Sequence, residues 1–207
     1  MKLIPEWYEH QYCLIAWPCN KDLYGKIINK ARDEVANVIN EIAKTEHVIV
    51  LSNKEDINEI QNKTDHKNID IVECKLDDSW MRDIAPIFYN ENEKLKSISF
   101  EFNGYGKYPD YLNDNKISKF ISNYLNIPTK ISDLVIEGGA ITYDDKKNLF
   151  STKNVIFNKN RKQKHNSEYI IKELKLLFDL NYIFLFENGL MEDCLLYTSD
   201  AADDAGS

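Results

Sequence analysis

Short apolar runs alternate along the chain with longer segments in which apolar residues recur every three or four positions. The short runs predict strands at residues 12–17, 47–51, 69–74, 86–89, 97–102, 134–136, 140–143, 155–157 and 182–186. The runs at 12–17, 47–51 and 182–186 are apolar almost throughout, so we expect buried strands there. The run at 97–102 alternates apolar and polar residues, so we expect it to pair with 86–89 across a polar turn and to keep one face in water.

Helical periodicity predicts amphipathic helices at residues 22–42, 117–125 and 170–178, and a short polar helix near 55–61. Strands that alternate with single helices predict an α/β fold. The strand–helix–strand order recurs loosely, without a tight sequence repeat. Because no Pro-, Gly- or Ser-rich linker divides the chain, we expect one domain.

Composition narrows the possible functions. The formal net charge is -8, which argues against a nucleic-acid-binding protein because such proteins normally present a basic patch. No stretch approaches the roughly 18 consecutive apolar residues of a membrane span, and the residues from Met1 to Trp7 lack the apolar core of a signal peptide. We therefore expect a cytoplasmic protein with neither nucleic-acid nor membrane partners.

The four cysteines stand apart, with no C-x-x-C pair and no histidine at ligand spacing: Cys13, Cys19, Cys74 and Cys194. This pattern argues against a structural zinc site and favours free thiols in a reducing compartment. Cys13 falls in a predicted buried strand, and the anionic neighbours of Cys74 oppose thiolate formation. The histidines have polar neighbours and are expected at the surface: His10, His47, His66 and His165.

Three carboxylates and an arginine surround a tryptophan in the segment Asp77-Asp78-Ser79-Trp80-Met81-Arg82-Asp83. One interpretation is a solvated turn with an Arg82 ion pair, and spacing alone favours it. The other is a receptor for a planar cation. A carboxylate such as Asp83 accepts two parallel N–H bonds from a guanidinium, while the ring of Trp80 covers its face.

Two further segments break the strand–helix pattern. Glu137-Gly138-Gly139 places an acidic residue at a strand end before two glycines, which permit a tight turn or a close backbone approach. A plain turn with an exposed Glu137 is the commoner case. Asn158-Lys159-Asn160-Arg161 closes a predicted strand and predicts a structural turn, and Gly104-Tyr105-Gly106 is too short for a phosphate loop.

Several segments follow one another in a fixed order: Pro5-Glu6-Trp7, His10, Ala16-Trp17-Pro18, residues 77–83 with Pro86, Asn103-Gly104, Lys107-Tyr108-Pro109, Glu137-Gly138-Gly139 and Asn158-Lys159-Asn160-Arg161. In this order the chain resembles agmatine deiminases and their relatives, the bacterial peptidylarginine deiminases. The likeness runs from about Pro5 to Glu192. Trp-Met-Arg-Asp followed by Glu-Gly-Gly is specific in combination, although neither motif is specific alone.

The resemblance implies an incomplete five-bladed α/β propeller (pentein) of ββαβ units, with about three blades present, and no metal or organic cofactor. It implies a hydrolase of amidine C–N bonds that converts agmatine and water to N-carbamoylputrescine and ammonia, in putrescine biosynthesis. In the family a Cys thiolate attacks the guanidinium carbon, a His moves protons and carboxylates grip the guanidinium. Carried over by motif, Asp83 would bind the guanidinium nitrogens, Glu137 would work beside the catalytic His, and Trp80 would wall the pocket.

The end of the chain departs from the family. The family's catalytic His, in a Gly-His-x-Asp segment, is expected just after Leu190-Met191-Glu192, and its nucleophilic Cys near the C-terminus. From Cys194 the chain instead resembles a translated sequencing adapter. We therefore expect residues 1–193 to be the N-terminal part of a deiminase domain, residues 194–207 to be a non-native tail that packs against nothing, and the chain alone to be inactive.

Three functions stay open. The first is agmatine deiminase, the second is peptidylarginine deiminase, and the third, of another class, is a non-catalytic guanidinium-binding module. We expect a small cationic guanidine compound as the substrate, and the intact protein could form a homo-oligomer. The lack of a signal peptide favours agmatine over peptidyl-arginine.

Overall fold

The computed structural model describes residues 1–65, 67–187 and 189, and the chain forms two compact units. The first unit contains Met1–Tyr8, Arg82–Pro109 and the described residues from Asn115 onward; the second contains Glu9–Met81 and Asp110–Asp114. The boundaries fall within ordinary loops, the short helix α4 (Met81–Ile84) and the 3-10 turn η4 (Asp114–Lys116), so composition carries no signal for them. Within the described residues, no helix has the length and apolar character needed to cross a membrane.

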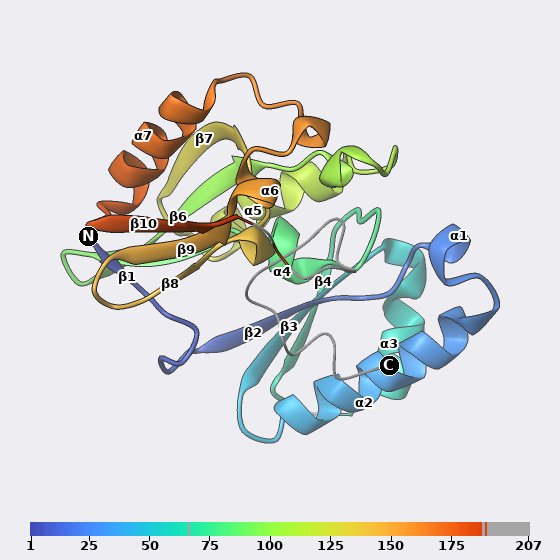
Figure 1. Cartoon of the computed structure of the whole chain (residues 1–207). Helices are drawn as coiled ribbons and strands as arrows, with labels where there is room; N and C mark the ends of the chain where they lie inside the picture. Colours follow the sequence, from blue (N-terminus) through green and yellow to red (C-terminus); the bar gives the residue numbers. More distant parts are fainter. Residues whose placement is uncertain (66, 188, 190–207) are drawn as a thin grey trace. The chain divides into compact units, whose positions relative to one another are not determined.

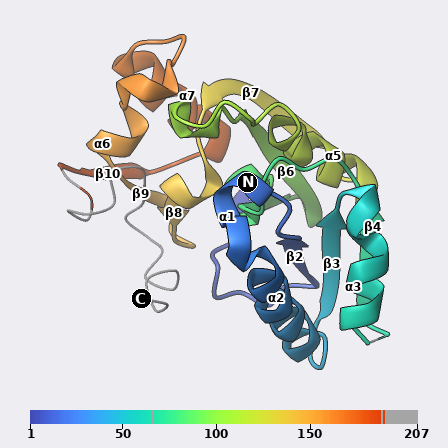
Figure 2. The same ribbon diagram turned by 90° about the vertical axis from the view of Figure 1, so that its right-hand side faces the viewer.

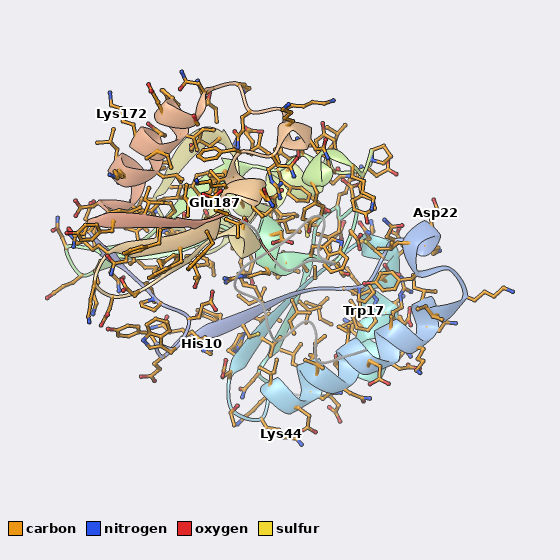
Figure 3. All side chains as sticks on the ribbon, in the orientation of Figure 1. His10, Trp17, Asp22, Lys44, Lys172 and Glu187 are labelled. Carbon is orange, nitrogen blue, oxygen red and sulfur yellow. The ribbon has the colours of Figure 1, made fainter. Side chains whose placement is uncertain are left out.

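The second unit is a parallel sheet covered by helices (Figure 1). Its strands, in the order β2-β3-β4, are Tyr12–Ala16, His47–Ser52 and Ile69–Glu73. Its helices are α1 (Lys21–Tyr24), α2 (Ile28–Ile42) and α3 (Ile57–Lys63), with 3-10 turns η1 (Gly25–Ile27) and η2 (Lys54–Asp56). α2 contacts both β3 and α3, and it buries Ala36 and Ile39 in the core of this unit. Trp17, labelled in Figure 3, is fully buried in this core with Ile39 and Val48.

The first unit contains two successive ββαβ arrangements of the same topology. In each, an antiparallel strand pair is followed by a helix and by a third strand parallel to the second. The first arrangement comprises β5 (Ile87–Glu91), β6 (Lys94–Glu101), α5 (Ile117–Tyr124) and β7 (Thr129–Val135), with β1 (Lys2–Leu3) added beside β5. The second comprises β8 (Thr142–Tyr143), β9 (Asn148–Thr152), α7 (Ser167–Phe178) and β10 (Tyr182–Phe186).

The helices of these two arrangements pack on their own sheets. α5 contacts β6 and α7 contacts β10 (Figure 2). The apolar face of α7 carries Ile170, Leu174 and Phe178 into a core that also holds Tyr89 and Leu149. Lys172, labelled in Figure 3, lies on the exposed side of the same helix. The spacing of apolar residues that predicts α7 is therefore the spacing that buries it.

Most of the predicted elements are confirmed, as is the mixed α/β class. The expected pairing of 86–89 with 97–102 is the β5–β6 hairpin. Its turn is tight because Asn92 and Glu93 both adopt positive φ, 52° and 62°. Such a backbone matches the twist of the two flanking strands.

The strand expected at 155–157 is wrong. Val155 and Ile156 belong to the short helix α6 (Lys153–Ile156), and the strand is β9, which ends just before this helix. Thr152 begins the helix because its side chain accepts a hydrogen bond from the Val155 N–H. A run of three apolar residues is too short to distinguish a strand from a buried helical turn.

Two expectations about burial are also wrong. The serines of β6 do not face water: Ser97 and Ser99 are fully buried, and the hydroxyl of Ser97 lies 2.9 Å from the hydroxyls of both Ser122 and Thr129. Strand β10 is only half-buried, because Tyr182 and Phe186 are 64% and 54% exposed. Short hydroxyl side chains can bond to each other in a core, so their polarity alone does not mark a wet face.

Candidate active site

Three loop segments of the first unit meet at one edge of its larger sheet for a topological reason. Helix α4 (Met81–Ile84) precedes the start of β5, the turn η3 (Gly104–Gly106) follows β6, and the turn η5 (Gly138–Ala140) follows β7. Because β5 is antiparallel to β6 and β7 is parallel to β6, the start of β5 and the ends of the other two strands share an edge.

Two glycines allow these segments to approach closely. A Cβ atom at Gly138 would lie 2.2 Å from the carbonyl oxygen of Arg82. At Gly106, where φ is +70°, a Cβ atom would lie 1.9 Å from the carbonyl oxygen of Asn160, which belongs to the turn η6 (Lys159–Arg161). Any larger residue would push the backbones apart. The glycine pair after Glu137 therefore permits a close backbone approach rather than a plain turn.

Asp83 is 4% exposed and is held at both carboxylate oxygens. The backbone N–H of Gly139 donates to Oδ1 at 3.0 Å, and the hydroxyl of Tyr105 donates to Oδ2. One donor comes from η5 and the other from η3, so the carboxylate ties together the ends of two strands. Asp83 itself lies on the short helix α4 rather than at a strand end.

Glu137 is fully buried and pairs with Arg161, which is 2% exposed. The Nε–H of Arg161 lies 2.8 Å from Oε2 and 3.1 Å from Oε1 of Glu137. The Nδ2 of Asn103 donates to the backbone oxygen of Arg161 at 2.8 Å. The segment 158–161, interpreted from the sequence as a structural turn, thus also places a buried cation, the Arg161 guanidinium, beside Glu137.

The electrostatic interaction between Asp83 and Glu137 indicates that the two predicted carboxylates lie close together. Burial raises the pKa of Glu137, the Arg161 guanidinium opposes that rise, and the negative charge of Asp83 adds to it. Asp83 and Glu137 are 54 residues apart in the sequence but close enough in the fold for this repulsion. Two buried carboxylates that repel each other form a site in which an added cation is favourable.

The remaining acidic residues of the sequence motif lie in the second unit. Asp78 is 8% exposed, and its carboxylate accepts bonds from the Trp80 indole N–H at 2.8 Å and the Ser79 N–H at 2.7 Å. The indole itself is 40% exposed. Arg82, in the first unit, makes an exposed ion pair with Glu6. The solvated-turn interpretation therefore fits Arg82 but not Asp78.

The cysteines of the described residues are poorly suited to nucleophilic attack. Burial, together with nearby carboxylates of which Asp114 has the largest effect, raises the pKa of Cys19 to about 12. Burial is also the main cause that raises the pKa of Cys74 to about 11 and the pKa of Cys13. Cys194 and the expected tail at 194–207 lie outside the described residues. Within the described part of the chain, no group of three or more His, Cys, Asp or Glu side chains is arranged to hold a metal ion.

Sequence reasoning missed two residues at this site. Arg161 was assigned to a structural turn, although an arginine that closes a predicted apolar strand can be drawn into the core by an acidic partner. Tyr105 lies in the Gly104-Tyr105-Gly106 turn, which was set aside because it is too short for a phosphate loop. The signal for Tyr105 was a bulky residue between two glycines, since glycines mark a backbone that other residues avoid.

Known proteins share this sequence and this fold. The chain is 30% identical over 194 residues to a putative agmatine deiminase of Mycoplasma capricolum, a match that covers 91% of this chain and 53% of the relative. It is 29% identical over 203 residues to an agmatine deiminase of Medicago truncatula, with coverages of 91% and 54%. The chain thus spans about half the length of the curated relatives it matches.

Comparison with solved structures finds proteins of the same kind. A C. jejuni C315S agmatine deiminase with substrate bound is 26% identical and superposes with a TM-score of 0.85, covering 95% of this chain and 59% of that one. An agmatine deiminase of Enterococcus faecalis, 18% identical, superposes with a TM-score of 0.87 over 95% of this chain and 55% of that one and shows the same fold. A family model also matches residues 2–204. With sequence, fold and this match in agreement, the chain belongs to the Porphyromonas-type peptidyl-arginine deiminase family.

Proposed function

We propose that this chain supplies the guanidinium-binding part of an agmatine deiminase, which hydrolyses agmatine to N-carbamoylputrescine and ammonia. The observation that carries the proposal is the meeting of Asp83 and Glu137 in buried, glycine-lined loops of the first unit. Relatives that are named agmatine deiminases support the choice of substrate. A planar monocation such as the agmatine guanidinium offsets the repulsion between two buried carboxylates.

In this proposal each residue has one role. Asp83 accepts parallel N–H bonds from the guanidinium, because Gly139 and Tyr105 hold its carboxylate from the protein side. Glu137 works beside the catalytic His, and Arg161 opposes the rise in its pKa that burial causes. No metal or organic cofactor takes part.

The bond-forming step requires groups beyond those described. A thiolate must attack the guanidinium carbon, ammonia must leave, and water must release the product from the thiouronium adduct. Cys13, Cys19 and Cys74 have raised pKa values that oppose thiolate formation. We therefore assign the nucleophile and the catalytic His to sequence after about Glu192, with residues 1–193 as the N-terminal part of the deiminase domain and residues 194–207 as a non-native tail.

The two ββαβ arrangements and the parallel sheet of the second unit are assigned to three blades of a five-bladed α/β propeller. Their number and the repeated strand order support this assignment, as does the share of 55% of the Enterococcus faecalis chain that is covered.

Sequencing the gene past the codon for Glu192, followed by an ammonia-release assay with agmatine, tests the proposal. We expect a continuous frame that encodes Gly-His-x-Asp and a late Cys, activity of that longer product, and no activity of the 207-residue chain. Asp83→Asn in the longer product should reduce turnover by about two orders of magnitude or more, because a neutral amide cannot provide the anionic grip. A stop codon after a native Ser207 would favour a non-catalytic guanidinium-binding module.

Peptidyl-arginine is the second candidate substrate, because the matching family model carries that description and a putative peptidyl-arginine deiminase of known structure is 27% identical. A kinetic competition between agmatine and an arginine-containing peptide, measured with the longer product, distinguishes the two candidate substrates. We expect agmatine to have the higher kcat/KM.

A further inference from the structure

The Gly104-Tyr105-Gly106 turn has a backbone that needs an explanation. All three residues have positive φ, 63°, 59° and 70°. Glycine adopts this region without cost, but an aromatic residue there is an outlier. Outliers of this kind persist where the surrounding structure fixes them, and they are concentrated at functional sites.

The surroundings of Tyr105 fix it from several sides. The N–H groups of Lys107 and Tyr108 both donate to the carbonyl oxygen of Gly104 at 2.9 Å. Gly106 lies directly against the Asn160 backbone. The Tyr105 ring meets Phe102 edge-on at a centroid distance of 5.2 Å and Tyr108 at 6.1 Å. These contacts leave the ring 4% exposed and aim its hydroxyl at Asp83.

Ring packing alone would be satisfied by phenylalanine. The hydroxyl adds a donor to Oδ2 of Asp83, while the Gly139 N–H donates to Oδ1. Two donors on different oxygens, carried by the ends of β6 and β7, define the plane of the carboxylate. A bidentate contact with a planar cation depends on that plane.

We propose that Tyr105 is a positioning residue for guanidinium recognition: its hydroxyl, presented by the left-handed Gly-Tyr-Gly turn, holds the Asp83 carboxylate in the orientation that receives the planar cation. The inference rests on the proposed function of Asp83 and extends it. Tyr105 acts through Asp83 and does not take part in bond formation.

The test compares Tyr105→Phe, which removes only the hydroxyl, with the matched control Tyr108→Phe in the same aromatic cluster. The first measurement is a carbon-13 NMR titration of the Asp83 carboxyl in the 207-residue chain, assigned with Asp83→Asn. A bond donated to a carboxylate favours its ionised form, so the midpoint should rise by about one pH unit or more in Tyr105→Phe. It should not move in Tyr108→Phe.

The second measurement is the Kd for agmatine by calorimetry. We expect it to rise about tenfold in Tyr105→Phe and more steeply as the pH falls, and to be unchanged in Tyr108→Phe. An unmoved Asp83 midpoint, or equal shifts in both variants, would overturn the positioning role. If the Asp83 midpoint moves in Tyr105→Phe but the wild-type chain binds no agmatine, the contact between Tyr105 and Asp83 is supported and the proposed function is overturned.

A readout independent of Tyr105→Phe folding is available. The hydroxyl proton of Tyr105 should give a slowly exchanging, downfield NMR signal that disappears in Asp83→Asn. Its persistence in that variant would contradict the proposal.

Discussion

Two groups of buried carboxylates differ in what balances their charge. In the first unit Glu137 has the Arg161 guanidinium as its partner. In the second unit Asp78 and Asp114 accept hydrogen bonds, among them those from the Ser79 amide and the Trp80 indole to Asp78 and that from the Asp77 amide to Asp114. Within the described residues, neither Asp78 nor Asp114 makes an ion pair.

The difference shows in the protonation of these groups. Burial, together with the charges of Asp77 and Asp78, raises the pKa of Asp114 to about 7. Burial also raises the pKa of Glu137, but Arg161 opposes it directly. Arg161 thus opposes the protonation of Glu137 with a full positive charge, whereas at Asp114 only hydrogen bonds oppose protonation.

The largest effect should come from removing the fixed cation. Arg161→Met leaves the Glu137 carboxylate buried without its partner, and we expect the free energy of unfolding to fall by about 3–5 kcal/mol. Urea denaturation measures it. The matched control is Arg82→Met, whose exposed pair with Glu6 should contribute less than about 1 kcal/mol. Equal losses of unfolding free energy in the two variants would mean that breaking the buried Glu137–Arg161 pair costs no more than breaking an exposed pair.

The second effect concerns Asp114 and pH. The folded protein holds this proton up to about pH 7, and an ordinary aspartate releases it near 3.8. Between these values the folded state binds more protons than the unfolded state, so stability falls as the pH rises. The fall should amount to about 2–4 kcal/mol, and Asp114→Asn should remove it.

Urea denaturation at several pH values measures this slope. Asp133→Asn is the control, because His165 lowers the pKa of Asp133 and its contribution has the opposite sign. If the wild-type protein and Asp114→Asn show the same slope, the carboxyl of Asp114 titrates normally and the comparison fails.

A smaller stability effect concerns two glycines, one in a crowded site and one in open space. Gly138→Ala brings a Cβ atom against the Arg82 carbonyl, and we expect a loss of about 1–3 kcal/mol. Gly25→Ala, in the second unit, meets no atom within 4 Å and is disfavoured only by its backbone, with φ +51° and ψ −127°, for about 1–3 kcal/mol. Thermal denaturation measures both losses, and unchanged stability of Gly138→Ala would contradict the close approach of the loops at Gly138.

The sequence predicts the fold well where periodicity is long and poorly where it is short. The stripe of α2 runs over fifteen residues and leaves no other interpretation. The triplet at 155–157 has no period, and the capping bond of Thr152 decides for a helix. The buried serines of β6 were misjudged because their partners come from α5 and β7, which are distant in sequence.

The candidate site was predictable only in part for the same reason. Motifs identified Asp83 and Glu137, since acidic residues next to tryptophan or paired glycines are local features. Their partners Tyr105 and Arg161 lie 22 and 24 residues away, and only the strand order brings them together. The division into two units is equally non-local, because residues 110–114 join the second unit from within the first.

The most direct measurement of the central claim is a calorimetric titration of agmatine into the 207-residue chain. The wild-type chain should bind agmatine more tightly than putrescine, which lacks the guanidinium. Asp83→Asn should weaken agmatine binding by about tenfold or more, and Asp133→Asn, which removes an exposed carboxylate, should leave it unchanged. Equal affinity of wild type and Asp83→Asn, or no preference for agmatine over putrescine, would contradict the assignment of these loops as a guanidinium site.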